Sequence, residues 1–295
     1  MIKIAYMIDS LGFGGAERQL SLLARALPEP FSAVVISLSD DIHPFGDALR
    51  AKGIDVVALP RRSGLDARRL GGAIGAIRKH RADIVHGFLD AANAYAFFAG
   101  RMLRKPVVLS LRNELLRVTG ARAAVLTRML RSADQVLVNS KAGADHLRDD
   151  VGVDDNKVLH IPNWIDPERT GRVRDIPGSP PTIGFVGRFA RQKRLDILID
   201  AFAGVVGRIP DARLILMGSG GEKEMMTNRI ADLGIGGNVE IMDASPDIDS
   251  TLRRLHLFVM TSDFEGLPNS AMEALSMGIP IVSTPVGDVR ELVVA

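Results

Sequence analysis

The sequence has 295 residues, of which 46% are hydrophobic and 5% aromatic, and this suits two medium-sized globular domains rather than a disordered chain. It contains no cysteine, which excludes disulfides and thiolate metal sites. The net charge of +2 is unevenly spread, because residues 61–131 hold 15 Lys and Arg against 4 Asp and Glu, whereas residues 176–295 hold 11 against 15. No apolar stretch of the sequence has the length that a bilayer requires.

The first half of the chain alternates strand-like segments with helical ones. Residues 2–8 form a short apolar run that Asp9 ends, so we predict a strand there rather than a signal peptide. Further strands are predicted, in chain order, at residues 33–38, 56–59, 84–88, 107–111, 135–139 and 158–161. Helical runs lie between most of them, and this alternation is typical of a parallel sheet with helices on both faces.

A proline-rich stretch without periodicity follows, and we interpret residues 166–181 as a linker. A second series of strands is predicted at residues 182–186, 213–217, 239–242, 257–260 and 279–283. The sequence therefore predicts two α/β domains, at residues 1–165 and 182–295. Because ligands bind outside the carboxyl ends of parallel strands, we expect a cleft between the carboxyl ends of the two sheets.

The turn after the first predicted strand is rich in glycine. Gly12, Gly14 and Gly15 precede a predicted helix, and glycine lets backbone amides approach a phosphate or a sugar closely. Glu17 occupies the third glycine position of the dinucleotide-binding fingerprint, so that fingerprint is not met. Asp40, at the end of the second predicted strand, keeps a nicotinamide-dependent enzyme as an alternative. Such a turn is also needed simply for tight packing of a strand against a helix.

A basic loop follows the first strand of the second domain. Gly187 and Arg188 come directly after this strand, and Lys193 follows five residues later. Both cations are placed to reach a diphosphate, and charge-assisted contacts of this kind contribute about 1.5–3 kcal/mol each. An ordinary basic turn between a strand and a helix is the plain alternative for Arg191 and Arg194.

Two carboxylates flank the start of a later helix. Glu265 lies on the loop after the strand predicted at 257–260, and Glu273 lies in the first turns of the helix predicted at 269–277. The amides near the helix start, those of Gly266, Leu267 and Asn269, favour an anion such as phosphate. A glutamate that accepts two sugar hydroxyls beside such an anion site is suited to hold a nucleotide sugar. The plain alternative is a helix whose first turn is acidic.

Asp247 and Asp249 imitate an Asp-x-Asp pattern that holds a metal ion in some enzymes. They lie where a helix begins, and Asp is a favoured capping residue there. No histidine or further carboxylate nearby completes a site. We therefore interpret the pair as a helix cap and predict no metal site.

Taken together, these motifs resemble glycosyltransferase family 4 (group 1), a family of retaining enzymes with the GT-B fold. The resemblance follows the family's order through residues 14–18, 83–86, 132–140, 158–163, 187–193, 218–220 and 265–273, and it covers essentially the whole chain. It implies two Rossmann-like parallel-sheet domains that face a cleft. The first would bind the acceptor, and the second, which is short, would bind the nucleotide sugar.

The resemblance implies a role for each matching residue. Arg188 and Lys193 would hold the donor diphosphate and stabilise it as it leaves, Glu273 would bind the ribose, and Glu265 the transferred sugar. The remaining positions implied to bind the donor are Gly14, Gly15, Gly187, Gly218, Gly266, Leu267 and Asn269. His86 would be a catalytic residue. No cofactor or metal is implied.

The implied activity is the retaining transfer of a hexose-type sugar from a UDP- or GDP-sugar to a glycan or lipid-linked acceptor. This transfer would serve the synthesis of cell-envelope polysaccharide or glycolipid. A cytoplasmic protein is expected, held peripherally on the inner face of the membrane through the basic residues 61–131. Nucleic acid is not expected as a partner, because no basic motif interleaved with aromatic residues is present.

Three positions depart from the family pattern. Phe88 stands where the family often places a polar residue, so His86 is equally well interpreted as a core histidine. Trp164 follows Asn163 where glycine is usual, which alters that turn. The sequence ends at Ala295 where relatives continue with a strand and helices, so a truncated chain or a compact variant is expected. A nucleotide-sugar-binding protein without turnover, and a GT-B epimerase or phosphorylase, stay open as alternatives.

Overall fold

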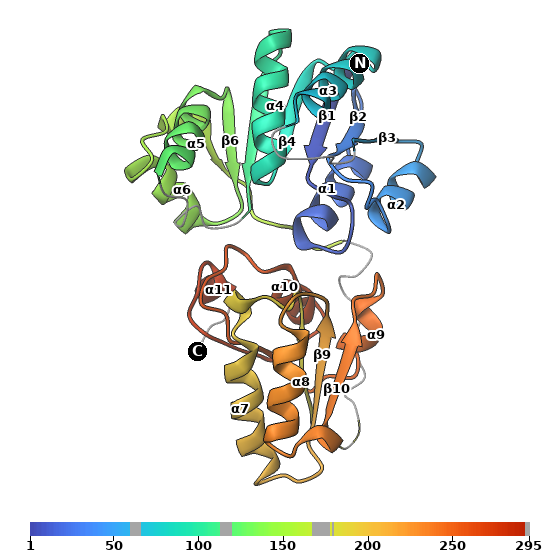
Figure 1. Ribbon diagram of the computed structural model, residues 1–295, viewed down its shortest axis with the longest axis vertical. Coiled ribbons are helices and arrows are strands. Elements are labelled where there is room, and N and C mark those ends of the chain that lie inside the picture. The colour runs from blue at the N-terminus through green and yellow to red at the C-terminus, as the bar shows by residue number, and fades with distance from the viewer. Residues whose placement is uncertain (60–65, 113–119, 167–177, 179, 293–295) are drawn as a thin grey trace. The chain divides into compact units, whose positions relative to one another are not determined.

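The computed structural model describes residues 1–59, 66–112, 120–166, 178 and 180–292 (Figure 1). The chain forms two compact units, Met1–Asn163 and Trp164–Ala295. Residues 167–177 and 179, which make up most of the predicted linker at 166–181, lie outside the described residues.

The first unit is built on a parallel sheet with the strand order β3-β2-β1-β4-β5-β6-β7. Its strands are β1 (Ile2–Ile8), β2 (Phe31–Ser37), β3 (Asp55–Ala58), β4 (Ile84–Phe88), β5 (Val107–Leu111), β6 (Gln135–Val138) and β7 (Val158–His160). Its helices are α1 (Gly15–Arg25), α2 (Phe45–Ala51), α3 (Ala67–Lys79), α4 (Asp90–Leu103), α5 (Gly120–Ser132) and α6 (Lys141–Asp149), with a 3-10 turn, η1 (Asp155–Lys157).

Both faces of this sheet are buried, as the near-continuous apolar composition of its strands predicts. Successive side chains of β1 enter different cores: Ala5 and Met7 pack into one, whereas Tyr6 and Ile8 pack into the other. Because side chains alternate between the faces of a strand, helices must cover both sides. The two cores are therefore the two faces of one sheet.

The second unit repeats this plan with the strand order β10-β9-β8-β11-β12. Its strands are β8 (Thr182–Val186), β9 (Arg213–Gly218), β10 (Val239–Asp243), β11 (Leu257–Met260) and β12 (Ile281–Ser283). Its helices are α7 (Leu195–Val206), α8 (Lys223–Asp232), α9 (Ile248–Leu252), α10 (Asn269–Ser276) and α11 (Val289–Leu292), with 3-10 turns η3 (Arg191–Lys193) and η4 (Gly236–Asn238).

The strands agree closely with the sequence prediction, and both sheets are parallel as expected. The largest differences are at the starts of β2 and β12, which begin at Phe31 and Ile281 rather than at residues 33 and 279. Before β12, Gly278 has a φ of +70° and Pro280 lacks an N–H, so regular pairing begins only after them. Asp40 follows the end of β2.

The carboxyl ends of β8 and β9 approach each other unusually closely. The Gly187 N–H donates to the carbonyl of Met217 at 3.0 Å, and Phe189 N–H donates to the carbonyl of Ser219 at 2.8 Å. A Cβ atom on Gly218 would lie 1.9 Å from the carbonyl oxygen of Gly187. Only glycine fits at Gly218 without moving this backbone.

We expect Gly218→Ala to lower the free energy of unfolding by about 2–3 kcal/mol, because the added methyl group meets backbone that cannot rotate away. Chemical denaturation measures this loss. Gly221→Ala is the matched control, since a Cβ there meets nothing within 4 Å, and its effect should stay within about 0.5 kcal/mol. Equal effects of the two substitutions would contradict the packing role of Gly218.

Candidate functional site

The carboxyl edge of the second sheet brings together two of the predicted loops. β8 pairs in parallel with β11, so the loop from β8 to α7 and the loop from β11 to α10 leave the sheet at the same edge. The first loop carries Arg188 and Lys193, and the second carries Glu265. These residues, far apart in the sequence, are thereby placed at one edge.

Lys193 and Glu265 form an ion pair between the Nζ and Oε1 atoms. Both side chains are largely withdrawn from solvent, with 16% and 9% of their surfaces exposed. The Ser262 hydroxyl donates to the same Oε1 atom at 2.6 Å. The structure therefore joins the residue predicted to hold the diphosphate to the residue predicted to hold the sugar.

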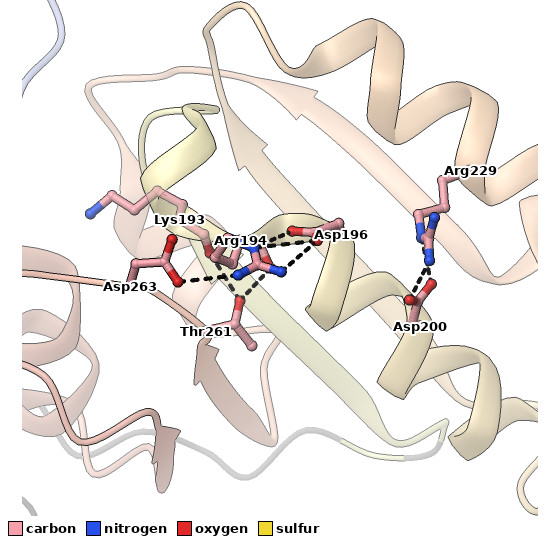
Figure 2. A network of polar contacts seen from close by, with 7 residues as sticks. All are labelled: Lys193, Arg194, Asp196, Asp200, Arg229, Thr261 and Asp263. Carbon is pink, nitrogen blue, oxygen red and sulfur yellow. Dashed lines mark hydrogen bonds and ion pairs between the residues drawn. The ribbon is translucent and has the colours of Figure 1, made fainter.

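Arg194 fixes the backbone beside Lys193. It has a φ of +46°, in the left-handed region, and its guanidinium bonds to Asp196 at 3.0–3.3 Å and to Asp263 at 3.2 Å. Figure 2 shows Arg194 between these two carboxylates, while the Lys193 side chain extends away from them. The pKa of Asp196 is lowered, chiefly by its hydrogen bond from Arg194. The network links the start of α7 to the loop after β11.

Further hydrogen bonds join the same two loops. Thr261 Oγ1 lies 2.9 Å from the carbonyl oxygen of Lys193 and 2.8 Å from that of Arg194 (Figure 2). The Asp263 N–H donates to the carbonyl of Gln192 at 2.8 Å. The sequence leaves an ordinary basic turn as the plain alternative for Arg194, and it gives Thr261 no distinguishing feature. The local sequence of a basic turn does not indicate hydrogen-bond partners as distant along the chain as Thr261 and Asp263.

Arg188 is exposed, unlike Lys193. Within the part of the chain that the structure describes, its guanidinium has no hydrogen-bond or ion-pair partner. Its carbonyl accepts from the N–H of Ala190 at 3.0 Å, which fixes the turn that presents the side chain. Arg188 is thus a positive charge that other described side chains do not neutralise.

Glu273 lies on α10 and is buried, with 7% of its surface exposed. Gly266 and Leu267 are buried in the loop before this helix, and Asn269 is its first residue. The Gly266 carbonyl accepts from the N–H of Asp288 at 3.1 Å. Gly287 packs against the same loop with a φ of +50°, and a Cβ there would lie 2.1 Å from the carbonyl oxygen of Glu265.

The remaining predicted glycines have structural roles that are evident in the free chain. Gly218 allows the close approach of β8 and β9 described above, while a Cβ on Gly187 would lie 2.9 Å from the Phe185 ring. Gly14 precedes α1, and a Cβ there would lie 2.0 Å from the Glu17 carboxylate, while Gly15 begins the helix. Their contact with a donor stays a prediction.

His86 is buried in β4 with 6% of its surface exposed. Its Nε2 atom lies 2.8 Å from the Ser110 hydroxyl, and its ring centroid lies 4.6 Å from that of Phe88. Burial, together with the charge of Arg112, lowers the pKa of His86 to about 3. The imidazole is therefore neutral at physiological pH, and a catalytic role for it stays a prediction.

Asp247 caps α9, as the sequence predicts. Its Oδ1 atom accepts from the N–H of Ser250 at 3.2 Å. Asp249 lies inside the helix, in its first turn. Among the described residues, no group of three or more His, Asp or Glu side chains is arranged to hold a metal ion.

Two units that are each built on a parallel sheet define a protein of the GT-B class. Comparison with known families agrees: the sequence model described as Glycosyltransferase Family 4 matches residues 13–169, and the one described as Glycosyl transferases group 1 matches residues 168–295. The chain belongs to glycosyltransferase family 4.

Two bacterial relatives resemble part of this chain. A Vi polysaccharide biosynthesis protein of Salmonella typhi is 33% identical over 131 residues, which is 44% of this chain and 22% of that protein. A poly(glycerol-phosphate) alpha-glucosyltransferase of Bacillus subtilis is 34% identical over 41% of this chain and 18% of its own length. These alignments span about a fifth of each relative.

Solved structures show the same fold. The Anabaena protein HepE in complex with UDP-glucose has a TM-score of 0.86 at 22% identity, and the match covers 100% of this chain and 84% of that one. WaaG, a glycosyltransferase involved in lipopolysaccharide biosynthesis, has a TM-score of 0.72 at 16% identity over 98% and 83% of the two chains. Within the described ranges of the present chain, no helix is long and apolar enough to cross a membrane.

The low pKa of His86 predicts a dependence of stability on pH. Between pH 6.5 and about pH 3 the unfolded chain protonates this histidine and the folded chain does not, so stability falls as the pH is lowered through this window. His86→Gln, which cannot take up this proton, should show a smaller loss between pH 7.5 and pH 5, by about 2 kcal/mol. Urea denaturation at both pH values measures the difference, and parallel losses would contradict the assigned pKa.

Proposed function

We propose that this chain is a retaining glycosyltransferase. It transfers a hexose-type sugar from a UDP- or GDP-sugar to a glycan or lipid-linked acceptor in the synthesis of cell-envelope polysaccharide or glycolipid. The observation that carries the proposal is the meeting of Lys193 and Glu265 at the strand edge that also presents Arg188. Family membership supports it, as do the relatives, which are named for polysaccharide biosynthesis and as an alpha-glucosyltransferase.

The leaving group determines the role of the two cations. As the bond between the anomeric carbon and the diphosphate breaks, negative charge grows on the diphosphate, and Arg188 and Lys193 stabilise it. These cations supply the electrostatic role that a metal ion has in other transferases, so we propose metal-independent transfer. Arg188 is the better placed of the two, since described residues leave its charge unneutralised.

The two glutamates bind the remaining parts of the donor, the ribose and the sugar. Glu273 accepts from the ribose hydroxyls and Glu265 from hydroxyls of the transferred sugar. The acceptor oxygen attacks the anomeric carbon on the side from which the diphosphate departs, and the acceptor proton passes to the diphosphate. This front-face route retains the configuration and needs no nucleophile from the protein.

Arg188→Ala tests the proposed chemistry. We expect it to lower kcat about 100-fold, as the loss of one preorganised donor to a developing anion does, and to lower donor affinity less. The assay follows nucleoside diphosphate release from a panel of UDP- and GDP-sugars, with and without a metal chelator. Arg229→Ala is the matched control, because Arg229 pairs with Asp200 on α7, away from the loop (Figure 2).

Donor binding without turnover by the unmodified chain would favour the alternative of a binding protein. A strict requirement for manganese or magnesium would contradict the metal-independent route. Equal effects of Arg188→Ala and Arg229→Ala would contradict the role of Arg188.

We also propose that the first unit binds an anionic membrane surface, where a lipid-linked acceptor would lie. The basic residues 61–131 carry the proposal, and their exposed described members are Arg68, Arg78, Lys79, Arg81, Arg101, Arg104, Arg128 and Arg131. Phe98 and Met102 add exposed apolar surface on the same helix, α4, as Arg101. Each basic residue near such a surface contributes about 1 kcal/mol.

Liposome sedimentation tests the membrane proposal. Vesicles with anionic lipid should retain the protein at low salt and release it as salt rises, because the attraction is screened beyond about 8 Å at physiological ionic strength. Vesicles of neutral lipid are the control. Equally low binding to both kinds of vesicle at low salt would favour a soluble acceptor instead.

A further inference from the structure

The ion pair between Lys193 and Glu265 has a consequence for the nucleotide. In the proposed function, Lys193 contacts the diphosphate and Glu265 contacts the sugar, yet in the free chain the two side chains contact each other. A nucleotide that binds at this site therefore encounters a lysine whose charge is already balanced by a carboxylate.

The pair is held in place from both sides. Lys193 ends the turn η3. The Thr261 hydroxyl and the Asp263 N–H form hydrogen bonds to the backbone of this turn. On the other side, the Ser262 hydroxyl fixes Glu265 Oε1, and the Ser262 carbonyl itself accepts from the Thr284 hydroxyl at 2.7 Å. Because both loops are fixed, the contact belongs to the resting structure of this edge.

We infer that Glu265 sets the preference of the site for the intact sugar donor over the free nucleoside diphosphate, by competing with the diphosphate for Lys193. The inference rests on the proposed function. When a sugar is present, its hydroxyls give Glu265 new hydrogen-bond donors and Lys193 turns to the phosphate. When the sugar is gone, Glu265 pairs with Lys193 again, and the diphosphate loses this cation to the carboxylate.

The local environment makes this competition effective. Lys193 and Glu265 are mostly shielded from water, so the attraction between them is screened less than at an exposed site. The diphosphate has to draw the Lys193 ammonium away from a carboxylate that already balances its charge. Glu265 therefore weakens nucleotide binding by holding the lysine.

The inference makes a prediction opposite to ordinary loss of function. Glu265→Gln keeps the shape of the side chain and removes its charge. We expect the free nucleoside diphosphate to bind about tenfold more tightly, a gain of about 1.4 kcal/mol, whereas the sugar donor gains nothing and turnover falls. Calorimetry first identifies which of UDP, GDP and ADP binds the unmodified chain, and that nucleotide and its glucose derivative are then the probes.

Two further variants isolate the cause. In a Lys193→Ala background, Glu265→Gln should no longer tighten nucleotide binding, because there is no lysine left for Glu265 and the diphosphate to compete for. Asp200→Asn is the matched control for charge: it also removes one carboxylate from an ion pair of this unit, with Arg229, and should change nucleotide affinity by less than about twofold.

A substitution beside the pair gives a test if Glu265→Gln fails to fold. Ser262→Ala removes the second donor to Oε1 and leaves the Glu265 charge in place, so Glu265 depends more on Lys193. We expect nucleotide binding to weaken in Ser262→Ala, whereas it strengthens in Glu265→Gln.

Each outcome decides one question. Tighter nucleotide binding in Glu265→Gln that disappears without Lys193 supports the inference. Unchanged or weaker nucleotide binding in Glu265→Gln, with turnover lost, overturns the inference and leaves the proposed function standing. If none of the nucleotides binds, or if Lys193→Ala and Glu265→Gln both leave turnover unchanged, the proposed function fails and the inference fails with it.

Discussion

Parallel strand pairing is the constraint on which the candidate site depends. β8 pairs with β9 on one side and with β11 on the other, so every loop that follows these strands leaves at the same edge. The backbone contact between Gly187 and Gly218 brings two of these loops close together. The third loop places Glu265 in contact with Lys193, although the two residues are 72 positions apart in the sequence. The sheet thus brings together a set of residues that no single segment of the sequence contains.

The strands follow well from the sequence, because strands buried on both faces are continuous apolar runs that polar segments interrupt. The positions of Glu265 on a loop after a strand and of Glu273 within a helix are predictable in the same way. The contact between Lys193 and Glu265 is not. Contacts between two loops follow from strand order, which apolar periodicity does not encode.

The same limit explains Arg194, whose sequence context is that of a plain basic turn. One of its partners, Asp263, lies 69 positions away. Charge counting has a similar weakness. Arg69 and Arg112 both belong to the basic residues 61–131, yet Arg69 is buried beside the Tyr95 ring. Arg112 lies over the Phe88 ring, and burial lowers its pKa to about 10. A count of charges therefore overstates the positive surface.

The hydrogen bonds on either side of Glu265 also bear on how quickly the site is able to exchange its contents. Asp263 is tied through its N–H to Gln192, and Gly266 is tied through its carbonyl to Asp288, so the backbone around Glu265 is anchored at both ends. A switch of Glu265 between lysine and sugar then needs side-chain rotation alone. Lid opening takes microseconds or longer. The switch at this edge does not have to wait for a loop to open.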